Sequence, residues 1–174
     1  MNRPLIRQYG LLSVSLAAYC VVLALILREP AVPSGAPNTA ELLHPILALA
    51  GLTAVVWLLM FAFRNIAVAT GQAKLSYYRT YGAEAPPEWV ERPARTFMNL
   101  LEVPILFYVV AILMLQTGTW DTTQVTLAWT FVALRTLHAA VYIGLNYVPL
   151  RLATYLMGCI TLAVIWFRFA ATVG

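Results

Sequence analysis

Apolar residues along this chain are gathered into five long runs, which cover residues 10–27, 42–63, 97–115, 122–143 and 152–172. Shorter polar stretches separate these runs. A helix needs about 20 mainly apolar residues to cross a bilayer. The runs are close to that length, although the first is short. The pattern therefore predicts an all-α membrane protein with five spanning helices.

The third run begins with polar residues at a regular spacing. Arg95, Asn99 and Glu102 lie at or near its start. Because each helical residue turns the direction by about 100°, Asn99 falls about 40° to one side of Arg95, and Glu102 about 20° to the other. The three side chains therefore share one stripe of the helix. Pro104 follows, and because it lacks a backbone N–H, we expect the helix to bend there.

The fourth run carries a second polar stripe. His138 lies about 60° and Tyr142 about 20° from Arg135, on the same side. A charge at membrane depth costs several kcal/mol unless it is paired. We therefore expect the two stripes to face each other or a neighbouring subunit, with Arg135 as the counter-charge of Glu102.

The polar stripes allow two interpretations. They either line a pocket for a polar or anionic ligand at one end of the membrane, or form an interhelical polar contact that fixes packing. Arg151, between the fourth and fifth runs, either points at the mouth of the stripes or anchors the chain at the interface. Asn146 is a candidate cap for the last helix, with Pro149 in its first turn.

Basic residues outside the runs predict the orientation. Those on one side of the membrane are Arg3, Arg7, Arg64, Lys74, Arg79, Arg92 and Arg151, whereas the other side has Arg28 and Arg168. The positive-inside rule then predicts a cytoplasmic N-terminus and an external C-terminus. Residues 28–41, rich in proline, are expected to form an irregular external loop. Residues 117–121 are expected to form a tight turn between antiparallel neighbours.

The first apolar run can be interpreted as a signal peptide or as a retained membrane helix. Arg3 and Arg7 ahead of an apolar run resemble a secretory signal peptide. The run is long for a signal core, however, and residues 28–30 do not form a small-residue cleavage site. We interpret residues 1–41 as a retained membrane helix with an external loop, followed by a four-helix transmembrane domain over residues 42–174.

Composition supports a membrane protein. The chain is 61% hydrophobic and 10% charged, whereas a soluble domain carries about 25% charged residues. The net charge of +4 comes from basic residues at the ends of the runs, which are orientation signals and not a nucleic-acid patch. Cys20 and Cys159 each lie inside an apolar run and lack the spacing of a metal or redox site. We interpret both as small buried hydrophobes.

The polar motifs resemble those of a known family. Within residues 91–104, Arg95 is followed by Asn99 and then Glu102, which resembles the signature of the MAPEG family, the membrane-associated proteins in eicosanoid and glutathione metabolism. Arg135 and His138, with Tyr142 one turn later, resemble the family's second motif. The four later runs match its four-helix layout, and the first run is additional. Residues 74–78 and 86–88 look most like the uncharacterised bacterial branch.

This resemblance implies a homotrimer in a bacterial inner membrane, with ligand sites between neighbouring subunits. It also implies glutathione as a co-substrate near the cytoplasmic face, and a transferase or peroxidase activity on lipophilic electrophiles. Carried over to this sequence, the glutathione-binding set is Arg95, Asn99, Glu102, Arg135, His138 and Tyr142. Arg151 is the candidate by position for stabilising the reactive thiolate.

The sequence also bears on two other classes of function. A non-catalytic lipid-binding or scaffold protein of the same fold is favoured by the additional helix and by Phe97, which stands where catalytic relatives usually carry His or Gln. For His138, a packed interhelical role is an alternative to ligand binding. A channel or transporter is disfavoured because the polar residues cluster near one side and do not line a full aqueous path.

Overall fold

The computed structural model describes residues 3–28, 38–81 and 85–174. Its helices are α1 (Arg3–Arg28), α2 (Thr39–Ala69), α3 (Leu75–Thr80), α4 (Glu88–Thr117), α5 (Thr122–Ile143) and α6 (Val148–Val173). Among the described residues, four helices, α2, α4, α5 and α6, are long and apolar enough to cross a membrane, and α1 adds a shorter apolar stretch, Leu12–Arg28. The predicted fold class, a four-helix membrane bundle with an additional N-terminal helix, is confirmed.

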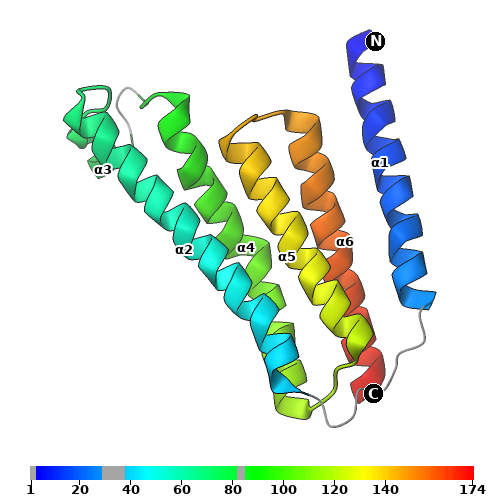
Figure 1. Cartoon of the computed structure of the whole chain (residues 1–174). Helices are drawn as coiled ribbons and strands as arrows, with labels where there is room; N and C mark the ends of the chain where they lie inside the picture. The colour runs from blue at the N-terminus through cyan, green and yellow to red at the C-terminus, as the bar shows by residue number, and fades with distance from the viewer. Residues whose placement is uncertain (1–2, 29–37, 82–84) are drawn as a thin grey trace.

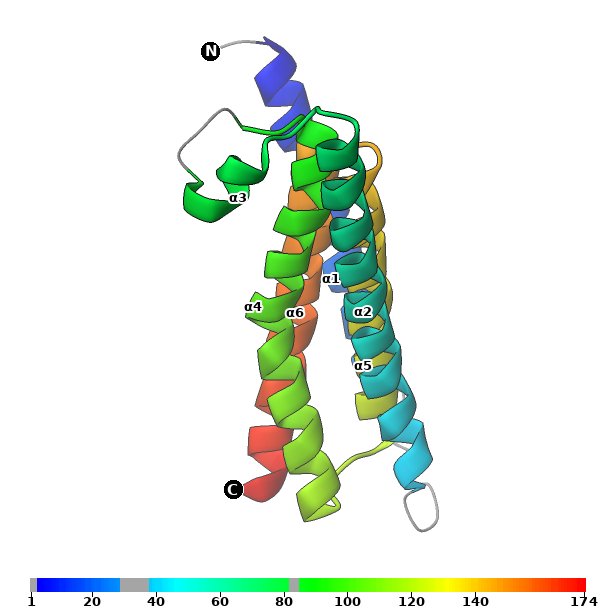
Figure 2. The same ribbon diagram turned by 90° about the vertical axis from the view of Figure 1, so that its left-hand side faces the viewer.

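The long helices stand side by side in one bundle (Figure 1). Helix α2 packs on α4 and α5, α5 packs on α6, and α1 lies along α6. We call the upper end the one that holds the N-terminus and the α5–α6 turn in Figure 1, and the lower end the one that holds the C-terminus and the α4–α5 turn. Helix α3 projects sideways from the upper end (Figure 2).

The helices extend beyond the apolar runs at the upper end. Helix α4 begins at Glu88, well before the run that starts at residue 97, and has Glu88 and Glu91 in its first turn. Acidic side chains there are stabilised by the helix dipole. Helix α2 likewise continues to Ala69, six residues past Phe63, the end of its apolar run. A hydropathy run therefore marks the part of each helix that suits lipid and not the whole helix.

The α4–α5 turn is as short as the sequence predicted. Gly118 closes α4 in the left-handed conformation, with φ of 68°, which glycine adopts without a steric penalty. The Asp121 side chain then accepts a hydrogen bond from the backbone N–H of Gln124 at 2.7 Å and caps α5. These two signals fix the end of one helix and the start of the next.

The bundle core is apolar and closely packed. Phe107 of α4 and Phe131 of α5 are both fully buried, and their rings stack at 5.0 Å between centroids. Large apolar side chains also cover the outside, among them Trp57 and Phe61 on α2 and Ile105 on α4. Such a surface suits lipid contact and would aggregate in water.

Helix α1 is attached to the bundle through α6. The Tyr19 hydroxyl is hydrogen-bonded to the hydroxyl of Thr161, and Leu23 of α1 is buried in the main core cluster. The expected external loop at residues 28–41 differs from the structure in part, because residues 39–41 already belong to α2. A short cap explains the early start: the Asn38 side chain accepts from the N–H of Ala40 at 3.1 Å. Residues 29–37 lie outside the described residues.

Candidate functional site

The first polar stripe lies on the outer side of α4. Arg95 and Glu102 are exposed, and Asn99 between them is half-buried. Pro104, two residues after Glu102, is buried, because two helical residues turn the direction by about 200° and place it on the opposite side of α4, towards the core. Two of the three predicted side chains therefore face away from the core of a single chain.

Arg135 lies at the centre of the bundle and is fully buried. Its guanidinium donates to Asn99 Oδ1 at 3.5 Å and to Cys159 Sγ at 3.6 Å. Its Cζ atom lies 5.1 Å from the centre of the Phe131 ring and 4.9 Å from that of Tyr155. The guanidinium thus joins α4, α5 and α6 at one point.

The space for this guanidinium depends on a glycine. A Cβ atom at position 158 would lie 3.0 Å from the NH2 atom of Arg135 and 3.2 Å from its Cζ. Contacts that short force one of the groups to move. Gly158 is therefore the residue that lets Arg135 fit against α6.

The predicted ion pair between Glu102 and Arg135 is absent from the described part of the chain. Glu102 is on the exposed side of α4, whereas the Arg135 side chain is buried and donates a hydrogen bond to Asn99. The Nε atom of Arg135 is buried without a hydrogen-bond partner. A buried cation without a carboxylate carries a large desolvation cost, which the hydrogen bonds to Asn99 and Cys159 and the two ring contacts offset in part.

His138 is packed between α5 and α6. It is buried, and its Nδ1 atom lies 3.0 Å from the carbonyl oxygen of Arg151 and 3.2 Å from Thr154 Oγ1. Its ring stacks on Tyr142 at 6.0 Å and tilts against Tyr155 at 5.7 Å. These contacts tie α5 to α6 and agree with a packed interhelical histidine.

Arg151 and Tyr142 are brought together at the upper end. The Cζ atom of Arg151 lies 3.4 Å from the centre of the Tyr142 ring, which is a stacked cation–π contact. The NH1 atom of Arg151 donates to Asn146 Oδ1 at 2.6 Å, and its Nε atom is buried without a partner. This contact holds the guanidinium against α5 and leaves part of its hydrogen-bonding capacity unused.

The prediction that Asn146 caps α6 was wrong, because Tyr147 occupies the N-cap position. Asn146 adopts the left-handed conformation, with φ of 49°, and its side chain joins Arg151 to Glu88, whose Oε1 accepts from Asn146 Nδ2 at 2.5 Å. Arg92 completes the network through an ion pair with Glu88 at 3.2 Å and a hydrogen bond to the Gly144 carbonyl at 3.0 Å. The α5–α6 turn is thereby held against the start of α4.

Two residues of this site were not predicted from the sequence. Tyr155 contacts both Arg135 and His138, and Cys159 accepts from Arg135. Both follow Arg151 at steps of four residues, which places the three side chains on one face of α6. That spacing was the available signal. The interpretation of both cysteines as buried hydrophobes was wrong, because Cys159 is half-buried and accepts from Arg135, and Cys20 is exposed.

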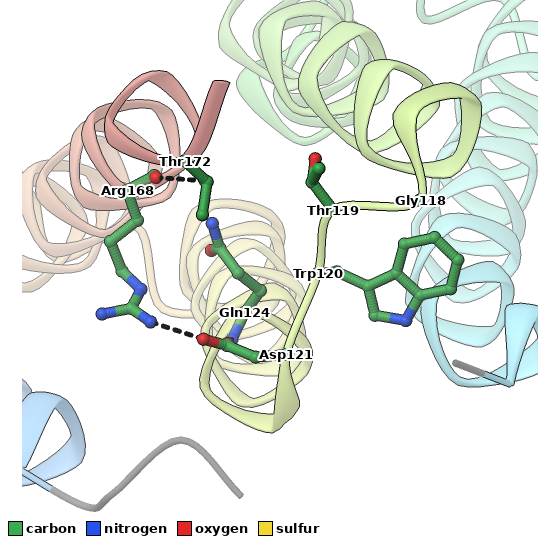
Figure 3. A pocket seen from close by; sticks show the side chains of 7 residues that line it. All are labelled: Gly118, Thr119, Trp120, Asp121, Gln124, Arg168 and Thr172. Atoms are coloured by element: carbon green, nitrogen blue, oxygen red, sulfur yellow. Dashed lines mark hydrogen bonds and ion pairs between the residues drawn. The ribbon is translucent and has the colours of Figure 1, made fainter. Parts of the chain in front are cut away.

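The lower end holds a separate polar cavity of about 200 Å³ (Figure 3). Arg168 and Asp121 face each other across it and form an ion pair at 2.7 Å. Gln124 lines the same cavity and reaches the carbonyl of Ile165 at 3.5 Å. Its charged groups already neutralise each other, and none of the predicted site residues lines it.

Comparison with known proteins gives one family. The model of the MAPEG family matches residues 42–171. The matched range covers α3, α4 and α5 in full and nearly all of α2 and α6, and it begins after α1. No curated protein and no solved structure matches the chain.

Proposed function

The chain belongs to the MAPEG family, and from this premise we propose that it is a glutathione-dependent membrane transferase or peroxidase acting on lipophilic electrophiles. Membership supports a membrane protein related to eicosanoid and glutathione metabolism. The specific activity is our inference, drawn from the charges of the candidate site.

The observation that supports it most is a set of arginines without carboxylate partners. Within the described residues, Arg95, Arg135 and Arg151 form no ion pair, and neither does Glu102. Three guanidinium groups and one carboxylate sum to +2. Glutathione in its thiolate form has two carboxylates, one thiolate and one ammonium group, which sum to −2. The net charge of the site is therefore equal in size and opposite in sign to that of the glutathione thiolate.

Each group has a natural counterpart on glutathione. Glu102 suits the ammonium group, and Arg95 and Arg135 suit the carboxylates, because guanidinium groups bind carboxylates in a bidentate manner. Arg151 is left for the sulfur. A cation beside a thiol favours the thiolate, which is the reactive form. In the transferase reaction, the thiolate forms a bond to the electrophilic carbon and the leaving group departs with the electron pair.

We further infer that the site is completed by other copies of the chain. Arg95 and Glu102 are exposed on a membrane helix, and charged side chains at that depth are costly in lipid. A homotrimer, as the family resemblance implies, would cover them and enclose the co-substrate between subunits. The proposed orientation has the upper end, with Arg151, on the cytoplasmic side, where glutathione is available. The proposed division is an N-terminal unit over residues 1–41 and the four-helix domain over 42–174.

Calorimetry on the purified chain in detergent tests the proposal. Glutathione should bind, and Arg95→Ala and Glu102→Ala should each weaken binding by about tenfold or more. Arg28→Ala, on α1 near the lower end, is the matched control and should bind as the unmodified chain does. Turnover of a halonitrobenzene with glutathione tests catalysis. The absence of binding at millimolar glutathione would contradict the proposal and favour a lipid-binding or scaffold role.

A further inference from the structure

A second cavity lies at the upper end, between α2 and α4. Its volume is about 380 Å³. Arg64, Glu91 and Arg95 line its polar part, and Met60, Phe97 and Met98 line its apolar part. We call it the upper recess. Apart from Arg95, none of these residues belongs to the glutathione set.

The polar part of the upper recess is not satisfied by the protein itself. In the described residues, neither Arg64 nor Arg95 forms an ion pair. The Nε atom of Arg64 and the Oε1 atom of Glu91 are both buried without a hydrogen-bond partner. Buried polar groups in native proteins are normally hydrogen-bonded. The recess therefore presents two guanidinium groups, and Glu91 adds a carboxylate whose Oε1 atom has no hydrogen-bond partner within the protein.

Arg64 is held at the wall of the recess by an aromatic side chain. Its Cζ atom lies 5.3 Å from the centre of the Tyr78 ring, and Tyr78 packs edge-on against Tyr77 at 5.3 Å. Burial raises the pKa of the Tyr78 phenol, so it remains a neutral partner for the guanidinium at physiological pH. The charge of Arg64 is thus positioned but not neutralised.

The upper recess lies at the level of the lipid headgroups, next to an apolar surface. Arg64 lies near the upper end of α2, and Tyr81, on the rim, is exposed at the end of α3. Tyrosines and arginines at a helix end are typical of the headgroup layer. Towards the bilayer centre, the neighbouring surface is apolar, with Phe61 and Leu101 exposed. A molecule in the recess therefore has its polar part among arginines and its apolar part against lipid-facing helices.

We propose that the upper recess binds a membrane phospholipid through its phosphodiester, which Arg64 and Arg95 contact, while Glu91 accepts a hydrogen bond from the headgroup. Basic pockets between membrane helices are known sites for lipid headgroups. The unused acceptor on Glu91 selects headgroups that carry a donor. Phosphatidylglycerol has hydroxyl groups and phosphatidylethanolamine an ammonium group, whereas phosphatidylcholine has neither.

The inference goes beyond the proposed function and does not depend on it. Arg95 is shared between the two proposals, so the decisive variants change Arg64 and Glu91, which glutathione binding does not use. If lipid selectivity is missing while glutathione still binds, only the phospholipid site is wrong. If glutathione fails to bind while lipid selectivity is present, the proposed glutathione-dependent activity is wrong and the phospholipid site is retained.

Native mass spectrometry of the delipidated full chain measures the selectivity directly. Dioleoyl phosphatidylglycerol and phosphatidylethanolamine should bind at least about tenfold more tightly than dioleoyl phosphatidylcholine. Arg64→Gln should weaken binding of all three lipids, and Glu91→Gln should remove the preference over phosphatidylcholine. Arg28→Gln, near the lower end, serves as the control and should change nothing. Arg64→Lys keeps the charge and should recover part of the affinity, which separates a lost contact from a misfolded chain.

Three results would overturn the phospholipid site. One is equal binding of the three lipids to the unmodified chain. Another is a preference that survives both Arg64→Gln and Glu91→Gln. The third is displacement of the bound lipid by inorganic phosphate at millimolar concentration, which would make the recess a site for a soluble phosphate and not for a membrane lipid.

Discussion

The guanidinium of Arg151 lies over the ring of Tyr142, with 3.4 Å between Cζ and the ring centre. The two residues belong to different helices, α6 and α5, on either side of the turn at the upper end. Such a contact fixes the orientation of a long and otherwise flexible side chain. The position of the charge proposed to stabilise the thiolate therefore depends on an aromatic ring.

This dependence predicts different outcomes for two changes at one position. Tyr142→Leu removes the stack and releases Arg151, and we expect glutathione affinity to fall about fivefold to tenfold, in line with a cation–π contact of about 1 kcal/mol. Tyr142→Phe keeps the ring and should retain the affinity. Calorimetric titration of both variants checks this. If Tyr142→Phe lost as much affinity as Tyr142→Leu, the hydroxyl and not the stack would be the important group.

Arg135 should be more important for binding than for stability. Replacing a buried, unpaired charge by an apolar side chain of similar size is often neutral or stabilising. We therefore expect Arg135→Met to leave the thermal midpoint unchanged or to raise it, and to weaken glutathione binding by about tenfold or more. Phe107→Ala, in the fully buried core, gives the comparison, because it should cost about 3–5 kcal/mol of stability. A loss of stability of that size in Arg135→Met would mean that the arginine has a structural role.

A single methyl group at Gly158 should disturb the same guanidinium. The Cβ of Gly158→Ala would lie 3.0 Å from Arg135 NH2, and overpacking of this kind costs about 1–3 kcal/mol. We expect a lower thermal midpoint and weaker glutathione binding. Gly51→Ala is a matched control within helix α2, because nothing lies within 4 Å of its added Cβ. It should be neutral or slightly stabilising, since alanine is the better helix former.

The polar contacts at the lower end should contribute to stability and not to glutathione binding. Asp121 caps α5 and also pairs with Arg168 at 2.7 Å. Asp121→Ala removes both interactions and should lower the free energy of unfolding by about 1–2 kcal/mol, mainly through the lost cap. Glutathione affinity should stay the same, because no candidate site residue is at that end. Thermal unfolding and calorimetry on one preparation separate the two effects, and a change in affinity would show that the ends are coupled.

The sequence predicted the fold well because lipid imposes a simple requirement on it. A run of about 20 apolar residues is visible without knowledge of packing. Helix α5 has the predicted limits, Thr122–Ile143, because the whole helix lies within the apolar run and the Asp121 side chain caps its start. The start of α4 at Glu88 was not predicted, because the polar residues of a helix beyond the membrane leave no hydropathy signal.

The site was predicted less completely for a geometric reason. Helical periodicity indicates which residues share a face, and so Arg95, Asn99 and Glu102 were grouped together. It does not indicate where that face points, so the expected pairing of Glu102 with Arg135 was wrong. The contact of Tyr155 with Arg135 depends on how α6 is rotated against α5, which the pattern of one helix does not determine.

Helix α1 limits how copies of this chain can meet. Because it lies along α6, the chain itself already shields that flank of its bundle. The outer side of α4 is not shielded in this way, and Arg95 and Glu102 are exposed on it. A second copy arriving there displaces no part of the first. In the proposed homotrimer, the flank of α6 is therefore the less accessible one, and the exposed charges of α4 remain open for contact with another copy.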